Sequence, residues 1–205
     1  MTRFSNDELR ERFIAAMGED LGICFWHLNQ KVLNLHIVWQ QYTQLYGDSE
    51  DTVSVLNRRA GFFFRVVQGE LWDSVLLGIS RLTDAAETRG KVVGKNLSVR
   101  ALPGLVSDVT LSTRLLELSE AAFQAAEFAR KHRNKRIAHQ DRDYLNSDTH
   151  PLERISRQRI DAMLQALRDV LNAVNLHFFE CTTFYEDVSA PGGAAWLVEQ
   201  LREIR

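Results

Sequence analysis

Residues 21–46 of this 205-residue chain have the sequence LGICFWHLNQKVLNLHIVWQQYTQLY. The large apolar side chains in this segment are spaced alternately four and three residues apart: Leu21, Phe25, Leu28, Val32, Leu35, Trp39, Tyr42 and Tyr46. This spacing places them along one face of a helix. Gly47 and Asp48 follow at once and predict the end of that helix. A long helix with one continuous apolar face has to pack against other helices.

The next segment, from Thr52 to about Ala86, carries apolar residues at helical spacing on two of its faces. A helix of this kind is typical of the centre of a bundle. Three glycines, Gly61, Gly69 and Gly78, predict close approaches of neighbouring helices or a kink near Gly69.

Two more long helices are predicted further along the chain. One runs from about Ser112 into a basic stretch, and its apolar face changes to small residues that let another helix approach closely. The other covers Ile160 to Phe178, which has the four-and-three spacing again. A break at 191–193 then precedes a short amphipathic helix over residues 194–204.

The segments between these helices look like loops, at Gly90 to Gly104 and at Asp141 to Pro151. The chain has only 3 prolines and 11 glycines, and no convincing strand-like alternation. We therefore predict an all-α fold, an antiparallel helical bundle of four to five main helices plus a short C-terminal helix. Residues 1–205 are expected to form one domain with its core at about 20–184.

Composition favours a cytoplasmic protein. Hydrophobic residues make up 45% of the chain and charged residues 25%, as in ordinary soluble proteins. The polar N-terminus does not resemble a signal peptide, and no apolar run is long enough to span a bilayer. We therefore expect no membrane association. Cys24 and Cys181 lie far apart within apolar helical patterns, so we also expect no disulfide.

Charge is concentrated in one stretch, Arg130-Lys131-His132-Arg133-Asn134-Lys135-Arg136-Ile137-Ala138-His139, where five of the first seven residues are Arg or Lys. Residues 130–159 contain nine basic and four acidic residues, a local charge of +5, whereas the rest of the chain carries -7. Such a cluster favours an anionic partner, here RNA, or the negative end of a helix dipole.

Arginine and histidine in this stretch suit cleavage of RNA without a metal or cofactor. His139 could accept the proton of a ribose 2′-hydroxyl, and Arg133 could stabilise the charge that develops on the phosphate. Asn134 would orient the phosphate or the histidine. The remaining cations would bind RNA phosphates: Arg130, Lys131, Lys135 and Arg136.

Six residues of an ideal helix turn through about 600°, which leaves Arg133 and His139 about 120° apart. The two side chains do not share one face, so one regular helix makes a poor site by itself. Two arrangements would remedy this: the helix unwinds near Ala138, or a second copy of the chain completes the site across a two-fold axis. A homodimer would also supply two histidines, one as base and one as acid.

The run from Arg133 to His139 resembles the signature of HEPN domains, an arginine followed by a polar residue and then a histidine a few residues further on. More narrowly, the chain resembles the AbiU-type abortive-infection branch over roughly residues 21–179. The shared features are the helix ending Ile79-Ser80-Arg81-Leu82-Thr83-Asp84, the segment Lys95-Asn96-Leu97-Ser98, and the basic run with Asp141 after it.

This resemblance implies an all-α domain, usually dimeric, with the two motif copies facing each other. Many members are metal-independent endoribonucleases of phage-defence or toxin–antitoxin systems, which also implies an antitoxin protein as a possible partner. Other members have lost activity. A related group carries a tyrosine two residues after the histidine that a nucleotidyltransferase modifies, but this chain has Asp141 there and its nearest tyrosine is Tyr144.

Other interpretations stay open. The basic run could only complement a helix end, or it could bind RNA or a protein without catalysis. Asp73, Ser80 and Asp84 could share one helix face near the site. For Arg81 and Asp84, with Glu70 and Asp73 upstream, a buried ion-pair network is favoured over a role in the site.

For the remaining histidines and tryptophans, structural positions are expected more than functional ones. His27 and His36 are expected in the core or an interface, and His132 could point towards the cavity of His139 or into solvent. The tryptophans, Trp26, Trp39, Trp72 and Trp196, are expected mostly in the core. His139, Asp141 and Asp143 could bind a divalent metal, but the chain has no established metal motif, so no metal site is predicted.

Overall fold

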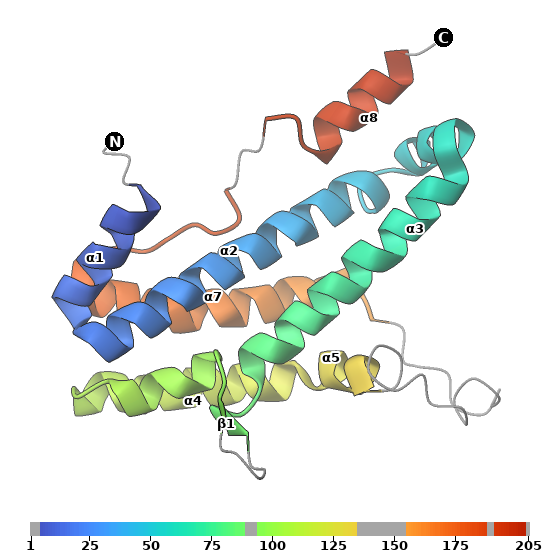
Figure 1. The fold of residues 1–205 in the computed structure, drawn as a ribbon. Coiled ribbons are helices and arrows are strands. Elements are labelled where there is room, and N and C mark those ends of the chain that lie inside the picture. The colour runs from blue at the N-terminus through green and yellow to red at the C-terminus, as the bar shows by residue number, and fades with distance from the viewer. Residues whose placement is uncertain (1–4, 89–93, 135–154, 188–190, 204–205) are drawn as a thin grey trace.

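A computed structural model of the chain describes residues 5–88, 94–134, 155–187 and 191–203. It is all-α, as the sequence predicts (Figure 1). Its helices are α1 (Asn6–Met17), α2 (Glu19–Tyr46), α3 (Glu50–Thr83), the 3₁₀ helix η1 (Val99–Leu105), α4 (Val109–Ala125), α5 (Glu127–His132), α7 (Arg157–Phe179) and α8 (Ala194–Glu203). Within the described residues, the only strands are β1 (Glu87–Thr88) and β2 (Gly94–Lys95), which pair antiparallel.

The first helix, α1, is an addition to the predicted bundle. Ser5 caps it: its hydroxyl accepts a hydrogen bond from the Glu8 backbone N–H, and the Glu8 carboxylate accepts one from the Ser5 N–H. This reciprocal arrangement stabilises a helix start in an otherwise polar segment. Gly18, with φ of 83°, then separates α1 from α2. Phe13 is buried against α2, so α1 belongs to the packed structure.

Helix α2 confirms the prediction for residues 21–46. The first six residues of its apolar face are buried, and Tyr42 and Tyr46 are half-buried at its far end. Gly47 ends the helix. The short connection at 47–49 returns the chain as α3, which runs antiparallel to α2 (Figure 1).

Helix α3 differs from the prediction in two ways. Its kink is at Ala60, where φ is -156° and ψ is 57°, and Gly69 is regular. Its C-terminal half is buried in the main core, whereas in its N-terminal half Leu56 packs in the smaller cluster with α8, and Phe62 and Phe63 near the kink are 84% and 59% exposed. Only the second half of α3 is therefore a central helix of the bundle.

The segment predicted as a loop at 90–104 contains ordered structure. β1 and β2 form a small hairpin, and η1 follows with Val99 and Leu102 fully buried. Ser98 caps η1 and donates a hydrogen bond of 2.6 Å to the carbonyl oxygen of Asp84. This bond ties the segment to the end of α3.

The long helix predicted from Ser112 is divided in two at Ala126, whose ψ of 5° departs from helical geometry. The small residues on its face do face the core, since Ala122, Ala126 and Ala129 are fully buried, whereas Ala125 is exposed. α7 confirms the last long helix and runs antiparallel to α4 (Figure 1).

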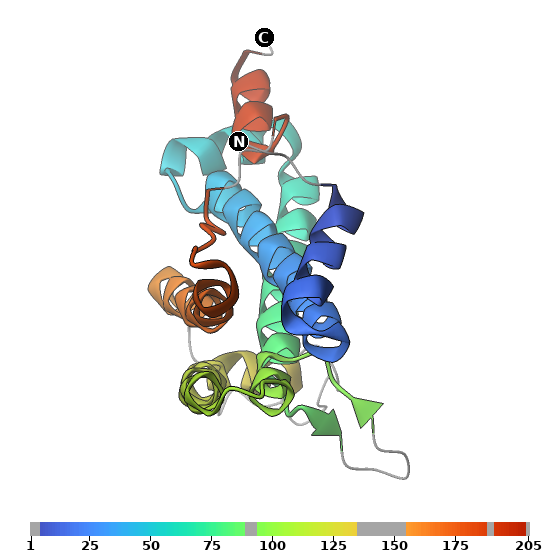
Figure 2. The same ribbon diagram turned by 90° about the vertical axis from the view of Figure 1, so that its left-hand side faces the viewer.

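Figure 2 shows α7 and α1 on opposite sides of the α2–α3 pair, with α4 and η1 below them. One large apolar cluster joins these elements, and a smaller cluster joins α8 to the far ends of α2 and α3. Trp39 lies in the core as predicted, but Trp196 on α8 is 56% exposed, which corrects its expected core position. None of the described helices is long and apolar enough to cross a membrane.

Candidate functional site at the junction of α3 and α5

The C-terminal half of α3 presents a polar line to α5. Asp73, Ser80 and Asp84 are spaced seven and four residues apart, which places them on one face of a helix. Ser80 is fully buried, and its hydroxyl has no hydrogen-bond partner in the described structure. Two of the three residues contact α5 or the residue that follows it, as the next paragraphs describe.

Arg133, the predicted phosphate-stabilising residue, is held by two neighbours. One of its terminal nitrogens (Nη1) lies 2.7 Å from Oδ2 of Asp84, and its Nε donates to Oδ1 of Asn134 at 3.2 Å. The side chains of Arg133 and Asp84 are each about three-quarters buried, at 25% and 31% exposure. These contacts fix the direction of the guanidinium and leave further N–H donors for an anion.

His132, next to Arg133, points into the protein. Its side chain is only 5% exposed, and its Nε2 lies 3.1 Å from Oδ1 of Asp73. The sequence left open whether His132 faces a cavity or solvent; the structure excludes the solvent position. Together with the Arg133–Asp84 pair, this contact binds α5 to α3 at two successive residues.

Two predicted phosphate contacts are already engaged within the protein. The Arg130 guanidinium stacks on the Phe123 ring at 3.9 Å and donates to the Phe123 carbonyl oxygen at 2.6 Å. Burial lowers the pKa of Arg130 from its usual value. Lys131 is exposed and pairs with Glu127 at 2.8 Å, one turn earlier on α5.

The structure thus brings Arg133 and Asn134 together beside Asp84. The other predicted site residues, Lys135, Arg136 and His139, lie outside the described residues, as do the candidate metal ligands Asp141 and Asp143. Among the described residues, no group of three histidine, cysteine, aspartate or glutamate side chains could hold a metal ion.

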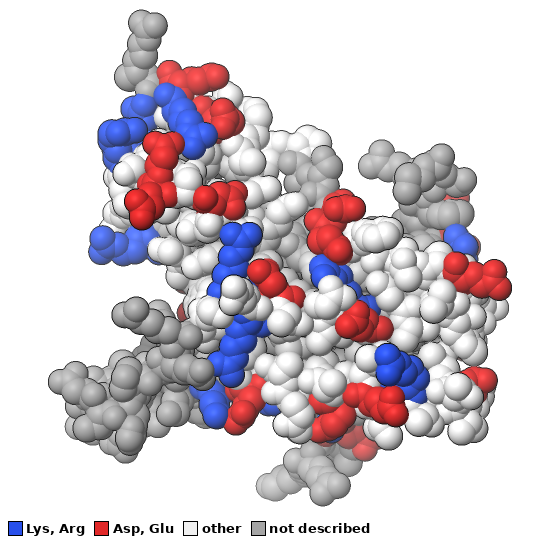
Figure 3. Space-filling model, turned by 180° about the vertical axis from the view of Figure 1, so that it is seen from behind, with Lys and Arg blue, Asp and Glu red and all other residues white. Residues whose placement is uncertain are grey.

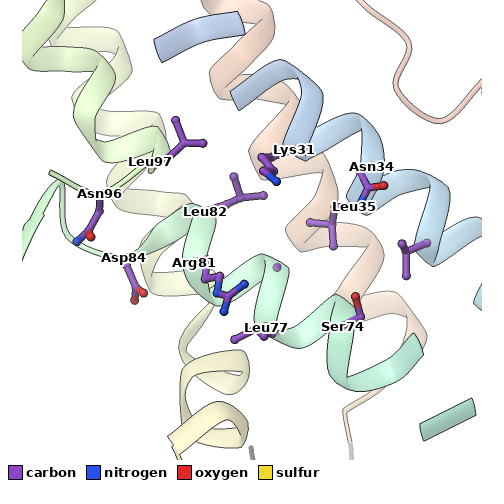
Figure 4. A pocket seen from close by; sticks show the side chains of 12 residues that line it. Lys31, Asn34, Leu35, Ser74, Leu77, Arg81, Leu82, Asp84, Asn96 and Leu97 are labelled. Atoms are coloured by element: carbon purple, nitrogen blue, oxygen red, sulfur yellow. The ribbon is translucent and has the colours of Figure 1, made fainter. Parts of the chain in front are cut away.

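A pocket of about 460 Å³ opens on the other side of Asp84, between α2, α3 and the segment after β2 (Figure 4). Its lining is part polar and part apolar: Lys31, Asn34, Leu35, Val38, Ser74, Leu77, Gly78, Arg81, Leu82, Asp84, Asn96 and Leu97. In Figure 4, Lys31 and Asn34 of α2 lie across the pocket from Arg81 of α3, and Asp84 and Asn96 lie at one end.

Arg81 corrects one prediction. It is exposed and lines this pocket, so it is not part of a buried ion-pair network, because α3 turns this position towards solvent. Asp84 does form an ion pair, but with Arg133 and at the edge of the core.

Sequence reasoning missed Lys31 and Asn34, which look like ordinary solvent positions on the polar side of α2. Only the packing of α2 against α3 shows that they face Arg81. It also missed the pairing of His132 with Asp73, although the sequence suggests that both residues lie near the site. His36 is buried as expected, but His27 is exposed.

On the face shown in Figure 3, blue and red side chains of the described residues are interspersed, and a line of blue side chains runs beside the grey residues. The basic residues Lys131 and Arg157 lie in the two described segments that flank residues 135–154. Each of the two is paired with a carboxylate in the described structure.

Comparison with protein families matches residues 7–194 to the HEPN_AbiU2 family model, described as AbiU2. The match includes all of α1 except its first residue, reaches the first residue of α8, and contains the junction of α3 and α5. No curated protein and no solved structure matches the chain.

Proposed function

Because this chain belongs to the AbiU2 family of HEPN proteins, we propose that it is a metal-independent endoribonuclease of a phage-defence or toxin–antitoxin system that acts in the cytoplasm. The observation that carries the proposal is the position of Arg133. Its guanidinium is oriented by Asp84 and Asn134 at the end of α5 and stands near a pocket open to solvent. Oriented charge of this kind is what stabilises a phosphorane-like transition state.

In the proposed reaction, His139 removes the proton from a ribose 2′-hydroxyl. The 2′-oxygen attacks the adjacent phosphorus, and the bond from phosphorus to the 5′-oxygen breaks. Arg133 stabilises the charge on the non-bridging oxygens, and a protonated histidine returns a proton to the 5′-oxygen. The products are a 2′,3′-cyclic phosphate and a 5′-hydroxyl.

A homodimer is part of this proposal. A second copy would supply the second His139, so that one histidine acts as base and the other as acid. An antitoxin protein would restrain the activity in the cell.

The test is incubation of the purified chain with total RNA in the presence of a chelator. We expect cleavage, with 2′,3′-cyclic phosphate ends detected by mass spectrometry. His139→Ala and Arg133→Gln should each abolish cleavage while the circular dichroism spectrum stays unchanged. His177→Ala, at an exposed position near the end of α7, is the matched control and should cleave like the wild type.

An RNA oligonucleotide with a single 2′-deoxy substitution at the cut site should resist cleavage, since it lacks the nucleophile. Cleavage of that oligonucleotide, or of DNA of the same sequence, would refute the mechanism. Cleavage that needs a divalent metal would also refute it.

A second candidate is a catalytically inactive module that binds RNA or a protein. The observation that favours it is the internal pairing of three cations of the motif: Arg130 with Phe123, Lys131 with Glu127 and Arg133 with Asp84. Such a module would not cleave RNA under any condition, and its affinity for RNA would survive His139→Ala.

A further inference from the structure

The pocket between α2 and α3 has the size and the composition of a ligand site. Its volume of about 460 Å³ lies within the usual range for small-molecule sites, roughly 300–1,000 Å³. Leu35 and Leu82 form a buried floor, and Leu77 and Leu97 add half-buried apolar surface. A flat, weakly polar group fits such a floor better than a small inorganic ion.

The rim of the pocket carries two available cations. Lys31 and Arg81 are exposed, and neither side chain forms a hydrogen bond or an ion pair with any described residue. They differ in this respect from Arg130, Lys131 and Arg133, which all have partners. They come from different helices and stand on opposite sides of the pocket (Figure 4). Two such cations facing one space attract an anionic group.

Gly78 contributes to the shape of the pocket. A Cβ atom at this position would lie 2.9 Å from Cδ1 of Leu35, so glycine lets α2 and α3 approach closely here. Lys31 and Arg81 therefore stand on two closely packed helices.

The pocket and the proposed catalytic arginine share one neighbour, Asp84. Asp84 lines the pocket and also accepts the hydrogen bond from Arg133. A ligand in the pocket therefore lies next to the carboxylate that orients Arg133. Asn34 provides amide donors and an acceptor on the same rim, which suits the polar edge of a nucleobase.

We infer that this pocket is a nucleotide subsite for the RNA substrate, in which Lys31 and Arg81 hold a phosphate next to the scissile one and the leucine floor receives the base of that nucleotide. The inference rests on the proposed ribonuclease function. In this inference, the pocket positions the RNA strand so that its scissile phosphate lies at Arg133. The α2–α3 pair is then part of the substrate-binding surface.

The first experiment measures binding without cleavage. Fluorescence anisotropy of a labelled single-stranded RNA is recorded on the His139→Ala background, with Lys31→Gln and Arg81→Gln added singly and together. Both positions are exposed, so these variants should fold. Each should weaken binding about three- to tenfold and lower the slope of log Kd against log salt by about one. Arg65→Gln, at an exposed position on the same helix, is the matched control and should change neither.

A second variant tests the pocket without changing its charge. Ser74→Trp places a bulky side chain at an exposed position of the lining and should weaken RNA binding by a similar factor. In the otherwise wild-type chain, the charge variants should lower kcat/KM for RNA in proportion to the loss of affinity. Adenosine 5′-monophosphate and inorganic phosphate are titrated in parallel to separate an RNA subsite from a site for a free nucleotide.

Unchanged RNA affinity in the double variant overturns the inference, and so does tight binding of the free nucleotide that the same variants abolish while RNA binding persists. Failure of the proposed function is a separate result, because then the otherwise wild-type chain cleaves no RNA, whatever residues occupy positions 31 and 81. In that case the anisotropy series still decides whether the pocket holds an RNA nucleotide.

Discussion

Arg133 and Asp84 meet at 2.7 Å, so the residue that follows α5 is bound to the residue that follows α3. The contact joins positions 49 residues apart in the chain. Asp84 also lines the pocket between α2 and α3. The strength of this pair determines how firmly the proposed phosphate-binding group is held.

A double-mutant cycle measures that strength. Asp84→Asn, Arg133→Gln and the double variant are unfolded with urea, and the coupling free energy is taken from the cycle. Because both side chains are partly exposed, we expect coupling of roughly 1 kcal/mol. The exposed pair of Lys131 and Glu127 is the control and should give a smaller value. Coupling no larger than that of the control would mean that Asp84 does not hold Arg133.

A second prediction concerns the approach of α1 to α2. A Cβ atom on Gly22 would lie 2.6 Å from Cα of Ile14 and 2.8 Å from the carbonyl carbon of Phe13. Backbone atoms cannot swing aside, so Gly22→Ala should push α1 away and lower the free energy of unfolding by about 1–3 kcal/mol.

Gly69 is the matched control for that substitution. It lies within α3, and a Cβ atom there would meet nothing within 4 Å. Gly69→Ala should therefore raise the free energy of unfolding by somewhat under 1 kcal/mol, from helix propensity alone. Urea denaturation followed by circular dichroism measures both. Equal effects of the two substitutions would contradict the close packing of α1 on α2.

The same two glycines show how far sequence reasoning reaches here. The apolar spacing in residues 21–46 predicts α2 and its end at Gly47, because the apolar residues recur with the period of a helix. The pattern does not tell which glycine is crowded by a neighbouring helix. The sequence predicts a kink near Gly69, which is regular, whereas the kink is at Ala60, next to Gly61.

The candidate site, too, can be predicted from the sequence only in part. Arg133 and Asn134 follow from a local motif, and Asp84 was placed near them by its helical face. The partner of Asp84 was not predictable, because an ion pair across 49 residues depends on how α3 and α5 pack. Lys31 shows the same limit: only a contact between two helices makes a solvent position part of a pocket.

A third prediction concerns acid stability. His36 on α2 is buried and stacks on Tyr185, and its Nε2 has no hydrogen-bond partner in the described structure. Burial, with a smaller effect of Arg168, lowers its pKa from 6.5 to about 4. The unfolded chain therefore binds a proton at this residue between these two pH values, whereas the folded chain does not. Stability from neutral His36 is complete above about pH 6.5 and is lost as the pH falls towards 4.

The His36→Phe variant keeps a ring at this position and removes the titrating group. Between pH 7 and pH 4.5 it should lose less stability than the wild type, by on the order of 2 kcal/mol. Urea denaturation at the two pH values measures the difference. His177→Phe, at an exposed position, should show the same pH dependence as the wild type. If His36→Phe also follows the wild type, His36 is not the group responsible.

The last prediction concerns α8, which packs apart from the main core. Ala194 and Val198 are buried against Leu45, Leu56 and Phe64 at the far ends of α2 and α3. The side chains of Gln41 and Gln44 accept hydrogen bonds from the first two backbone N–H groups of α8. These contacts satisfy donors that a helix start otherwise leaves unpaired.

Val198→Asp would bury a charge in this small cluster and should release α8 while the main bundle stays folded. Hydrogen exchange should rise in residues 194–203 and at the tip of the α2–α3 pair, and the main unfolding transition should change little. Trp196→Asp, on the exposed side of α8, is the matched control and should leave exchange unchanged. A loss of the whole transition in Val198→Asp would show instead that α8 and the bundle unfold as one unit.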